Sequence, residues 1–276
     1  MTKELNIQPI PTLEVINKYK NGESVLSLSK TYKTYTGKIQ SILDKNDIEK
    51  ITQAKRNNPL LIEDYFKCID TKEKAYWLGW LLTDGGISPD GDIEISLSNK
   101  DEYILKLFEK DLGISNHVKP FGQKYCRFYL GSKAMCNDLL QYGIVPNKTL
   151  ELKYPSNIPE KYETHLLRGM FDGDGGLTIG FATRFYKHRN KSYTKPYREL
   201  SFTGTYDMCE NFQKVLLKYT DFSIKNIGAN HNIYRVRWSS KEDIVNVMSV
   251  LYKDCEDHYL KRKYDLYLQL KNGDEK

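Results

Sequence analysis

Two aspartates hold matching places in two similar stretches of the sequence. The stretches are AYWLGWLLTDGG at residues 75–86 and HLLRGMFDGDGG at residues 165–176. When they are aligned on Gly79 and Gly169, Asp84 and Asp174 coincide, 90 residues apart. Each stretch is an apolar segment of helical length that has a glycine in its interior and ends in Asp-Gly. The pattern predicts two equivalent helices, each placing one carboxylate at its C-terminal end.

These carboxylates predict a bound cation. An acidic side chain at a helix C-terminus faces the negative end of the macrodipole, which costs about 0.3–1 kcal/mol. Two such helices side by side would also bring two like charges together. Because carboxylate and carbonyl oxygens suit Mg²⁺ or Mn²⁺, we expect Asp84 and Asp174 to lie at a divalent metal centre. A metal centre beside a basic groove would indicate phosphodiester hydrolysis.

The glycines predict how the helices pack. A glycine inside a helix costs about 0.5–1 kcal/mol relative to alanine, and its usual compensation is a close approach by another backbone. Two copies therefore predict two helices in contact at Gly79 and Gly169, as across a two-fold axis. The glycine after each aspartate, Gly85 or Gly175, suits a left-handed C-terminal cap.

Two other interpretations of the aspartates fit the sequence less well. A calcium loop opening at Asp172 would need Gly at its sixth position and Glu at its twelfth, where the chain has Leu177 and Thr183. A simple turn would explain DGDGG once. It would not explain why the glycine-containing helix and its Asp-Gly end occur twice.

The elements after each motif also repeat. Each motif leads into a hairpin, a helix, a basic alternating strand and a further helix, so each half is predicted to be αββαββα. The fold class is therefore α+β, with two pseudo-symmetric halves. Lys133 and Lys241 stand at matching positions, just after the last basic strand of each half. We expect domain boundaries at 1–62, 63–153 and 154–276.

The net charge of +6 conceals three windows that lack acidic residues, at 112–137, 175–198 and 222–241. Alternation along YCRFYL and IYRVRW places basic residues on one face of a strand, and such a face suits phosphate. An ordinary solvated sheet face is the alternative. The candidate DNA-contacting residues in these windows are Lys119, Lys124, Arg127, Arg184, Lys187, Arg189, Lys191, Lys195, Arg198, Arg235 and Arg237.

The two halves differ in the hairpin after the motif. The first hairpin is short and acidic, with Asp90, Asp92 and Glu94, whereas the second has 16 more residues and most of the basic cluster. We therefore expect asymmetric DNA contacts, heavier on the second half.

The N-terminal segment predicts three short helices over residues 12–45. Thr12 caps the first, Ser24 caps the second, and a turn at 33–35 leads to the third. The segment resembles the helix-turn-helix of resolvases and transposase-type DNA binders, which places the third helix in a major groove. A plain three-helix module is the alternative, and residues 46–62 are interpreted as a linker or a connecting helix. The exposed positions of the third helix would include Tyr35, Thr36, Lys38 and Gln40.

The two motifs resemble the paired signatures of a monomeric LAGLIDADG homing endonuclease. The matching segments are WLGWLLTDG at 77–85, LRGMFDGDG at 167–175, YGIVPNKT at 142–149 and YLKRKY at 259–264, and the resemblance covers roughly residues 65–270.

The resemblance implies two antiparallel sheets that form a saddle over double-stranded DNA, with the motif helices between them. Asp84 and Asp174 would hold the metals together with the carbonyls of Thr83 and Gly173. Lys133 and Lys241 would polarise the attacking water or stabilise the transition state, although solvated lysines at helix starts are an equal alternative. A monomer would then cut both strands of a long asymmetric site with Mg²⁺ or Mn²⁺.

Composition excludes several classes. No apolar run approaches the roughly 18 residues that a membrane span needs, and the first fifteen residues contain no signal-peptide core. Five cysteines without a CxxC pair favour a reducing compartment, so we expect the cytoplasm, or a host cytoplasm if the gene belongs to a phage. Two alternatives to a nuclease remain: a non-catalytic DNA-binding regulator and an RNA-binding intron maturase.

Overall fold

The computed structural model describes residues 10–146, 151–231 and 233–273. Two compact units divide the chain, Met1–Leu61 and Ile62–Lys276. Within the described ranges, no helix is long and apolar enough to cross a membrane. Three residues of the YGIVPNKT segment, Asn147 to Thr149, lie outside the described residues.

The first unit contains the three predicted helices. Its elements are α1 (Thr12–Lys20), α2 (Val25–Thr31), α3 (Thr36–Lys45) and a short α4 (Gln53–Asn57). Helices α1, α2 and α3 share a core built from Val15, Ile16, Tyr19, Leu28, Ile39 and Leu43. Ser24 caps α2 as expected, because its hydroxyl accepts from the Ser27 amide at 3.0 Å. The expected cap at Thr12 is wrong: Pro11 precedes the helix as its N-cap and makes no side-chain hydrogen bond.

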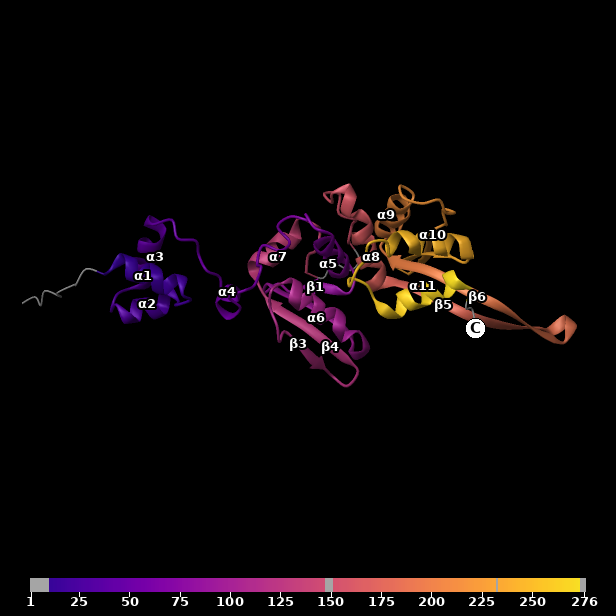
Figure 1. The fold of residues 1–276 in the computed structure, drawn as a ribbon, viewed down its shortest axis with the longest axis horizontal. Coiled ribbons are helices and arrows are strands. Elements are labelled where there is room, and N and C mark those ends of the chain that lie inside the picture. The colour runs from indigo at the N-terminus through magenta and orange to yellow at the C-terminus, as the bar shows by residue number, and fades with distance from the viewer. Residues whose placement is uncertain (1–9, 147–150, 232, 274–276) are drawn as a thin grey trace, which may run out of the picture. The chain divides into compact units, whose positions relative to one another are not determined.

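The second unit begins with one αββαββα half (Figure 1). Its elements are α5 (Lys72–Leu82), β1 (Gly85–Ile87), β2 (Asp92–Ser98), η1 (Asn99–Asp101), α6 (Glu102–Asp111), β3 (Val118–Phe121), β4 (Tyr125–Gly131) and α7 (Lys133–Leu140). The strands form an antiparallel sheet in the order β1-β2-β4-β3.

The other half repeats this order and adds one helix. Its elements are η3 (Glu160–Tyr162), α8 (Glu163–Asp174), β5 (Gly175–Tyr186), η4 (Lys187–Arg189), β6 (Lys191–Gly204), α9 (Tyr206–Leu216), β7 (Gly228–Asn230), β8 (Ile233–Trp238), α10 (Lys241–Leu251) and α11 (Lys261–Asn272). The sheet order β5-β6-β8-β7 matches that of the first half. The predicted α+β class and the repeated topology are confirmed.

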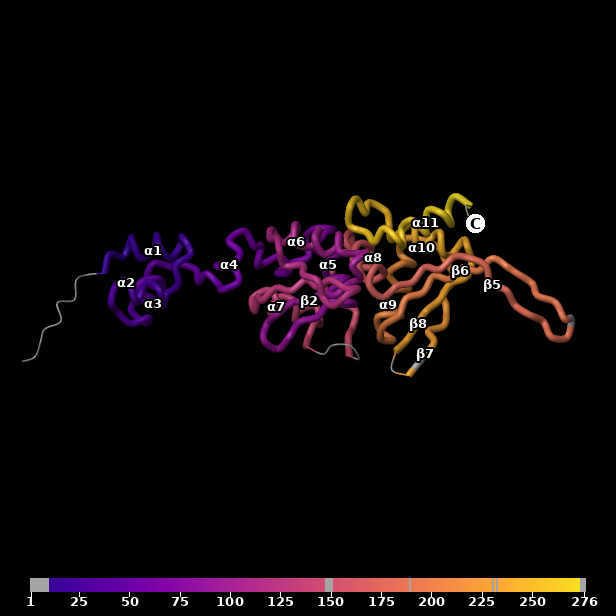
Figure 2. The backbone as a smooth tube through the Cα atoms, turned by 90° about the horizontal axis from the view of Figure 1, so that it is seen from below, coloured from indigo at the N-terminus to yellow at the C-terminus, as the bar shows by residue number. Residues whose placement is uncertain are grey.

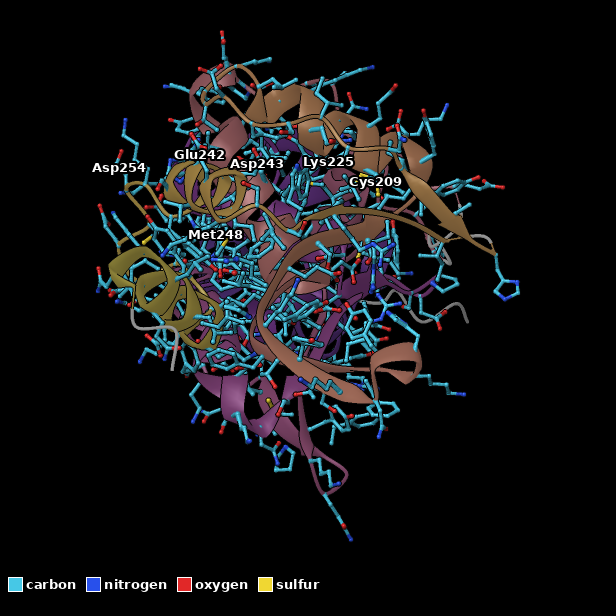
Figure 3. The ribbon with its side chains drawn as sticks, turned by 90° about the vertical axis from the view of Figure 1, so that its right-hand side faces the viewer. Cys209, Lys225, Glu242, Asp243, Met248 and Asp254 are labelled. Atoms are coloured by element: carbon cyan, nitrogen blue, oxygen red, sulfur yellow. The ribbon has the colours of Figure 1, made fainter. Side chains whose placement is uncertain are left out.

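Each sheet buries one face under its helices. Along β4, Cys126, Phe128 and Leu130 are buried, whereas the residues between them are half-buried or exposed. Because side chains alternate along a strand, the second set shares the opposite face, which we call the outer face. Figure 3 shows α9 and α10 beside the second sheet, where Lys225 and Asp243 pair at 3.3 Å.

Helices α5 and α8 pack backbone against backbone at their glycines. A Cβ placed on Gly79 would lie 2.4 Å from the Leu166 carbonyl oxygen and 2.8 Å from the Gly169 Cα. A Cβ on Gly169 would lie 2.0 Å from the Tyr76 carbonyl oxygen. The predicted glycine contact is therefore confirmed, and it brings the two halves together.

The glycines that follow the aspartates act differently from expectation. Gly175 is extended, with φ −80° and ψ 158°, and Gly85 does not have a positive φ. The expectation of left-handed caps is wrong. A Cβ on Gly85 would lie 2.8 Å from the Leu81 Cα, and one on Gly175 would lie 2.4 Å from the Phe171 carbonyl oxygen. Glycine is needed at both positions because the first residue of each strand lies against the preceding motif helix, where a side chain has no room.

The second hairpin extends beyond its sheet. Strands β5 and β6 pair over twelve rows, from Gly175↔Phe202 to Tyr186↔Lys191. On β6, the segment from Leu200 to Gly204 also pairs with β8. The remaining rows form a two-stranded arm, residues 178–199, that projects from the unit (Figures 1 and 2).

The glycine contact predicts that Gly79→Ala and Gly169→Ala each lower the free energy of unfolding by at least about 2 kcal/mol, because a backbone must move to admit the methyl group. Chemical denaturation measures this. Gly180→Ala is the control, since a Cβ there meets no atom within 4 Å. Equal stability of the Gly79 and Gly180 variants would contradict the close packing.

Candidate active site

The four predicted metal-ligating residues come together where α5 and α8 end. A Cβ placed on Gly173 would lie 2.0 Å from Thr83 Oγ1 and 3.6 Å from Asp84 Oδ2. Thr83 and Asp174 line one pocket of about 180 Å³, together with Leu82, Phe202, Thr203 and Ile233 among others. The pocket thus joins the end of α5 to the second sheet.

The C-terminal ends of α5 and α8 are exposed to a similar degree, although the two helices end at different positions of the repeated motif. Helix α5 ends at Leu82 with Thr83 as its C-cap, whereas α8 continues to Asp174. Asp84 and Asp174 are both exposed, and the residue before each is half-buried. Each aspartate directly precedes the first strand of its sheet, so both carboxylates stand where helix gives way to sheet.

The donor atoms at this position suit a hard divalent cation. Two carboxylates and the carbonyls of Thr83 and Gly173 supply oxygen only, the ligand set of Mg²⁺ and Mn²⁺. No group of three or more His, Cys, Asp or Glu that could hold a metal occurs within the described ranges. Any ion at this centre would therefore complete its coordination with backbone oxygens, water or substrate oxygens.

Sequence reasoning missed a lysine at this centre. Lys263 of α11 is 3% exposed, and its Nζ donates to the carbonyl oxygens of Phe171 at 2.6 Å, Asp172 at 2.8 Å and Gly175 at 2.6 Å. The Gly173 oxygen is 3.4 Å away. Burial lowers the Lys263 pKa to about 8, while the carboxylates of Asp172, Asp84 and Asp174 act in the opposite direction. An ammonium group thus caps the C-terminus of α8.

Asp172 is a structural acid that connects the halves. Its side chain is fully buried and accepts hydrogen bonds from Tyr76 Oη at 3.0 Å, Tyr252 Oη at 2.9 Å and the Leu260 amide at 2.9 Å. Burial raises the Asp172 pKa, and the Lys263 charge, the Tyr252 hydroxyl and the Leu260 amide oppose that shift. Because Tyr76 belongs to α5, the carboxylate joins the two motif helices.

The segment 258–263 ties the first half to the second. His258 Nε2 lies 2.6 Å from Asp111 Oδ2, which also accepts from Trp77 Nε1 at 2.7 Å. The Lys261 amide donates to Tyr103 Oη at 2.7 Å, and Arg262 Nε lies 3.2 Å from Asp101 Oδ2. This C-terminal segment therefore places Lys263 by contacts to both halves.

The sequence contained weak signals for these residues. Leu260, Lys263, Tyr267 and Leu270 are buried at helical spacing, so one lysine interrupts the apolar face of α11. Asp172 aligns with Leu82 of the first motif, which marks it as a feature of one copy only. Neither signal identifies the atoms that these side chains contact.

No protein-family model matches the sequence, and no curated protein matches it either. Solved structures do match. The LAGLIDADG meganuclease I-CpaMI bound to uncleaved DNA superposes with a TM-score of 0.51 at 15% identity, over 72% of this chain and 89% of that one. The LAGLIDADG homing endonuclease I-SmaMI bound to cleaved DNA gives 0.50 at 11% identity, over 72% and 87%.

This is the LAGLIDADG meganuclease fold. The similarity covers a length of chain comparable to the second unit, and it rests on shape because the sequences are so different.

The outer faces of this meganuclease fold carry a matched pair of arginines. Arg127 on β4 donates from Nε to Ser96 Oγ at 3.0 Å, and Arg235 on β8 donates from Nε to Thr203 Oγ1 at 3.1 Å. The two pairs hold equivalent positions in their sheets. Each sheet begins with a glycine pair, Gly85↔Ile95 or Gly175↔Phe202, and Ser96 and Thr203 are the next residues after Ile95 and Phe202. A cleft of about 650 Å³ on the second sheet is lined by Arg235, Arg237 and Thr203 among others.

Acidic neighbours offset more of the basic charge on the first sheet. Glu94 lies 3.3 Å from Arg127, and Asp92 also faces outward on β2. On the second sheet, Arg237 is 3.8 Å from Glu199, the acid on that outer face. The first sheet also exposes the aromatic rings of Phe121, Tyr125 and Tyr129. The outer faces therefore differ in charge.

Register divides the basic residues of the arm. Arg184, Lys191 and Lys195 share the outer face, whereas Arg198 pairs with Ile179 and shares the face of Leu200. Lys187 and Arg189 belong to η4 at the arm's tip, and the side chain of Arg189 lies outside the described part. The exposed candidates elsewhere are Lys119, Lys124, Tyr35, Thr36 and Lys38, while Gln40 is half-buried and donates to Asp44.

Lys133 and Lys241 occupy equivalent places. Each is the first residue of the helix that follows the last strand of its sheet, after a serine N-cap. Lys133 lies against the first hairpin, since a Cβ on Gly91 would be 2.5 Å from its Cγ.

The contacts predict a large loss of stability on replacing Asp172 and a small change on replacing the nearby Asp174. Asp172→Ala leaves the hydroxyls of Tyr76 and Tyr252 and the Leu260 amide without their buried acceptor, and we expect it to lower the free energy of unfolding by about 3 kcal/mol or more. Asp174→Ala, at an exposed position, should change it by less than about 1 kcal/mol. Urea denaturation distinguishes the two, and comparable losses would contradict the structural role of Asp172.

Proposed function

We propose that this chain is a site-specific endonuclease of the homing type, which hydrolyses both strands of DNA with a divalent metal. The observation that carries the proposal is the closeness of Asp84 to the residue before Asp174, since a Cβ on Gly173 would lie 3.6 Å from Asp84 Oδ2 where the two glycine-packed helices end. The fold of DNA-bound meganucleases supports it. Because both motifs belong to one chain, a monomer would provide a complete centre.

Asp84, Asp174 and the carbonyls of Thr83 and Gly173 are the proposed ligands of Mg²⁺ or Mn²⁺. A bound divalent ion would supply an activated water and stabilise charge on the leaving oxygen. The protein's part is to hold these oxygens in place beside the pocket that Thr83 and Asp174 line. Lys133 and Lys241 are the proposed groups that polarise the attacking water or stabilise the transition state.

We expect Asp84→Asn and Asp174→Asn each to lower metal-dependent cleavage by at least about a hundredfold, because each removes a carboxylate from the centre. A randomised plasmid library treated with Mg²⁺ and sequenced at its breaks measures this and finds the target. Asp265→Asn, at an exposed position of α11, is the control. Tight specific binding by the wild type without cleavage at any site would instead favour a DNA-binding regulator.

The outer faces are the proposed DNA surface, with the larger contribution from the second half. Arg184, Lys191 and Lys195 on the arm continue the face of Arg235 and Arg237. A strand rises about 3.3 Å per residue, so the arm has the reach to follow a groove beyond the centre. The result would be a long target site with unequal halves.

We further propose that the first unit binds DNA as a helix-turn-helix. Helices α2 and α3 pack closely and are joined by a short turn that contains Lys33 at φ +48°. Tyr35, Thr36 and Lys38 on α3 are exposed, as a major-groove helix requires.

The arm predicts a change in salt dependence. Replacing Arg184, Lys191 and Lys195 together by Gln should reduce the slope of log K against log[salt] by about 3, since each phosphate contact contributes about 0.9. Fluorescence anisotropy with target duplex measures it. The matched control replaces Lys106, Lys214 and Lys253, exposed lysines on or beside helices, and should leave the slope unchanged. Equal slopes for both triple variants would exclude the arm from the DNA contact.

A further inference from the structure

The two arginines that hold equivalent places on the outer faces, Arg127 and Arg235, are anchored alike. Each donates from Nε to a hydroxyl of the neighbouring strand, Ser96 Oγ in the first sheet and Thr203 Oγ1 in the second. An anchor at Nε leaves the two terminal nitrogens of a guanidinium as the groups that can bind a ligand. The surroundings of those nitrogens therefore decide what each arginine can do.

The guanidinium of Arg127 is engaged by its own sheet. Its Nη1 lies 3.3 Å from Glu94 Oε2, and its Cζ lies over the Phe121 ring, 3.5 Å from the ring centre. A guanidinium that is anchored at Nε, paired with a carboxylate and stacked on a ring has few N–H groups left for a base. The same contacts hold Phe121 in place, and this residue remains 47% exposed on the outer face.

The guanidinium of Arg235 has neither of these neighbours. By register, Ser201 holds the place that Glu94 has in the first sheet. Asn230 holds the place of Phe121. Within the described residues, the Thr203 hydroxyl is the one hydrogen-bond partner of the Arg235 guanidinium, and no carboxylate lies within ion-pair distance of it.

Small residues leave room beside Arg235. Gly228 lies opposite it on β7, whereas Lys119 lies opposite Arg127 on β3. Gly228 and Ala229 help to line the same cleft of about 650 Å³ as Arg235. The commonest specific contact with guanine in a major groove is bidentate donation from arginine to O6 and N7, which needs two neighbouring free N–H groups. Arg235 meets this requirement and Arg127 does not.

We propose that Arg235 is a specificity-determining residue that reads a guanine in the second half of the target, whereas Arg127 is a positioning residue that fixes Phe121 against a thymine methyl group. An apolar ring is a common partner of that methyl group. The inference rests on the proposed DNA-binding function and names the bases that two equivalent positions select. Equivalent rows of the two sheets thus favour different bases.

Selection of bound duplexes from a randomised library, with EDTA or Ca²⁺ in place of Mg²⁺, tests the assignment of Arg235. Glutamine pairs with adenine in the way that arginine pairs with guanine. Arg235→Gln should therefore change one guanine of the selected site to adenine, and should bind the original site at least about fivefold more weakly. Arg127→Gln is the matched control and should change no guanine to adenine.

Deoxyuridine measures the role of Arg127, because it lacks only the methyl group of thymidine. When the thymines of the first half-site are replaced one at a time, one replacement should weaken binding by the wild type about threefold. Phe121→Ala should abolish that difference, and Arg127→Gln should reduce it by releasing the ring. Arg127→Lys keeps a cation for the ring and for Glu94, and should restore it.

Four results would overturn the inference and leave site-specific binding standing. They are a change from guanine to adenine with Arg127→Gln, unchanged base preferences with Arg235→Gln, equal binding of thymine and deoxyuridine by the wild type, and an unchanged thymine preference with Arg127→Gln. A wild type that selects no common sequence in either condition would overturn the proposed function, and the inference with it.

Discussion

The contact between α5 and α8 is the constraint on which the rest of this structure depends. At Gly79 and Gly169 the two backbones approach so closely that neither position has room for a methyl group. This contact sets the separation of the helices, and therefore of the residues at their C-terminal ends. It also orients the two sheets, because each begins directly after its motif helix.

Close packing at the glycines has a consequence one turn further on. Residues that are equivalent in the repeated motif, Thr83 and Gly173, share a space that admits only one side chain. A pseudo-symmetric fold therefore cannot be symmetric at its centre. Lys263 supplies the hydrogen bonds to the carbonyls at the end of α8 that the side chain of Thr83 supplies at the end of α5. It can do so because the segment 258–263 is held by contacts to both halves.

A buried polar network accompanies this arrangement. Asp172, Tyr76, Tyr252 and Lys263 lie together at the interface of the halves, where an uncompensated charge would cost several kcal/mol. Each donor in the network has a defined acceptor, so the interface is specific in geometry as well as apolar. Such a network fixes the relative rotation of two helices more strictly than apolar contact alone.

The sequence by itself determined the repeat, the αββαββα order, the glycine contact and the place of the two carboxylates, because these features depend on periodicity and local chemistry. Ser24 as a helix cap and the alternation of β4 and β8 belong to the same group. Tertiary structure alone decided the roles of Lys263 and Asp172, since their partners are distant in sequence and their residue types suit many surroundings. It also decided that Gly85 and Gly175 serve close packing rather than a left-handed turn, and that Arg198 faces away from the other basic residues of the arm. These outcomes depend on strand register and on packing between elements, and a local sequence pattern contains no information about either.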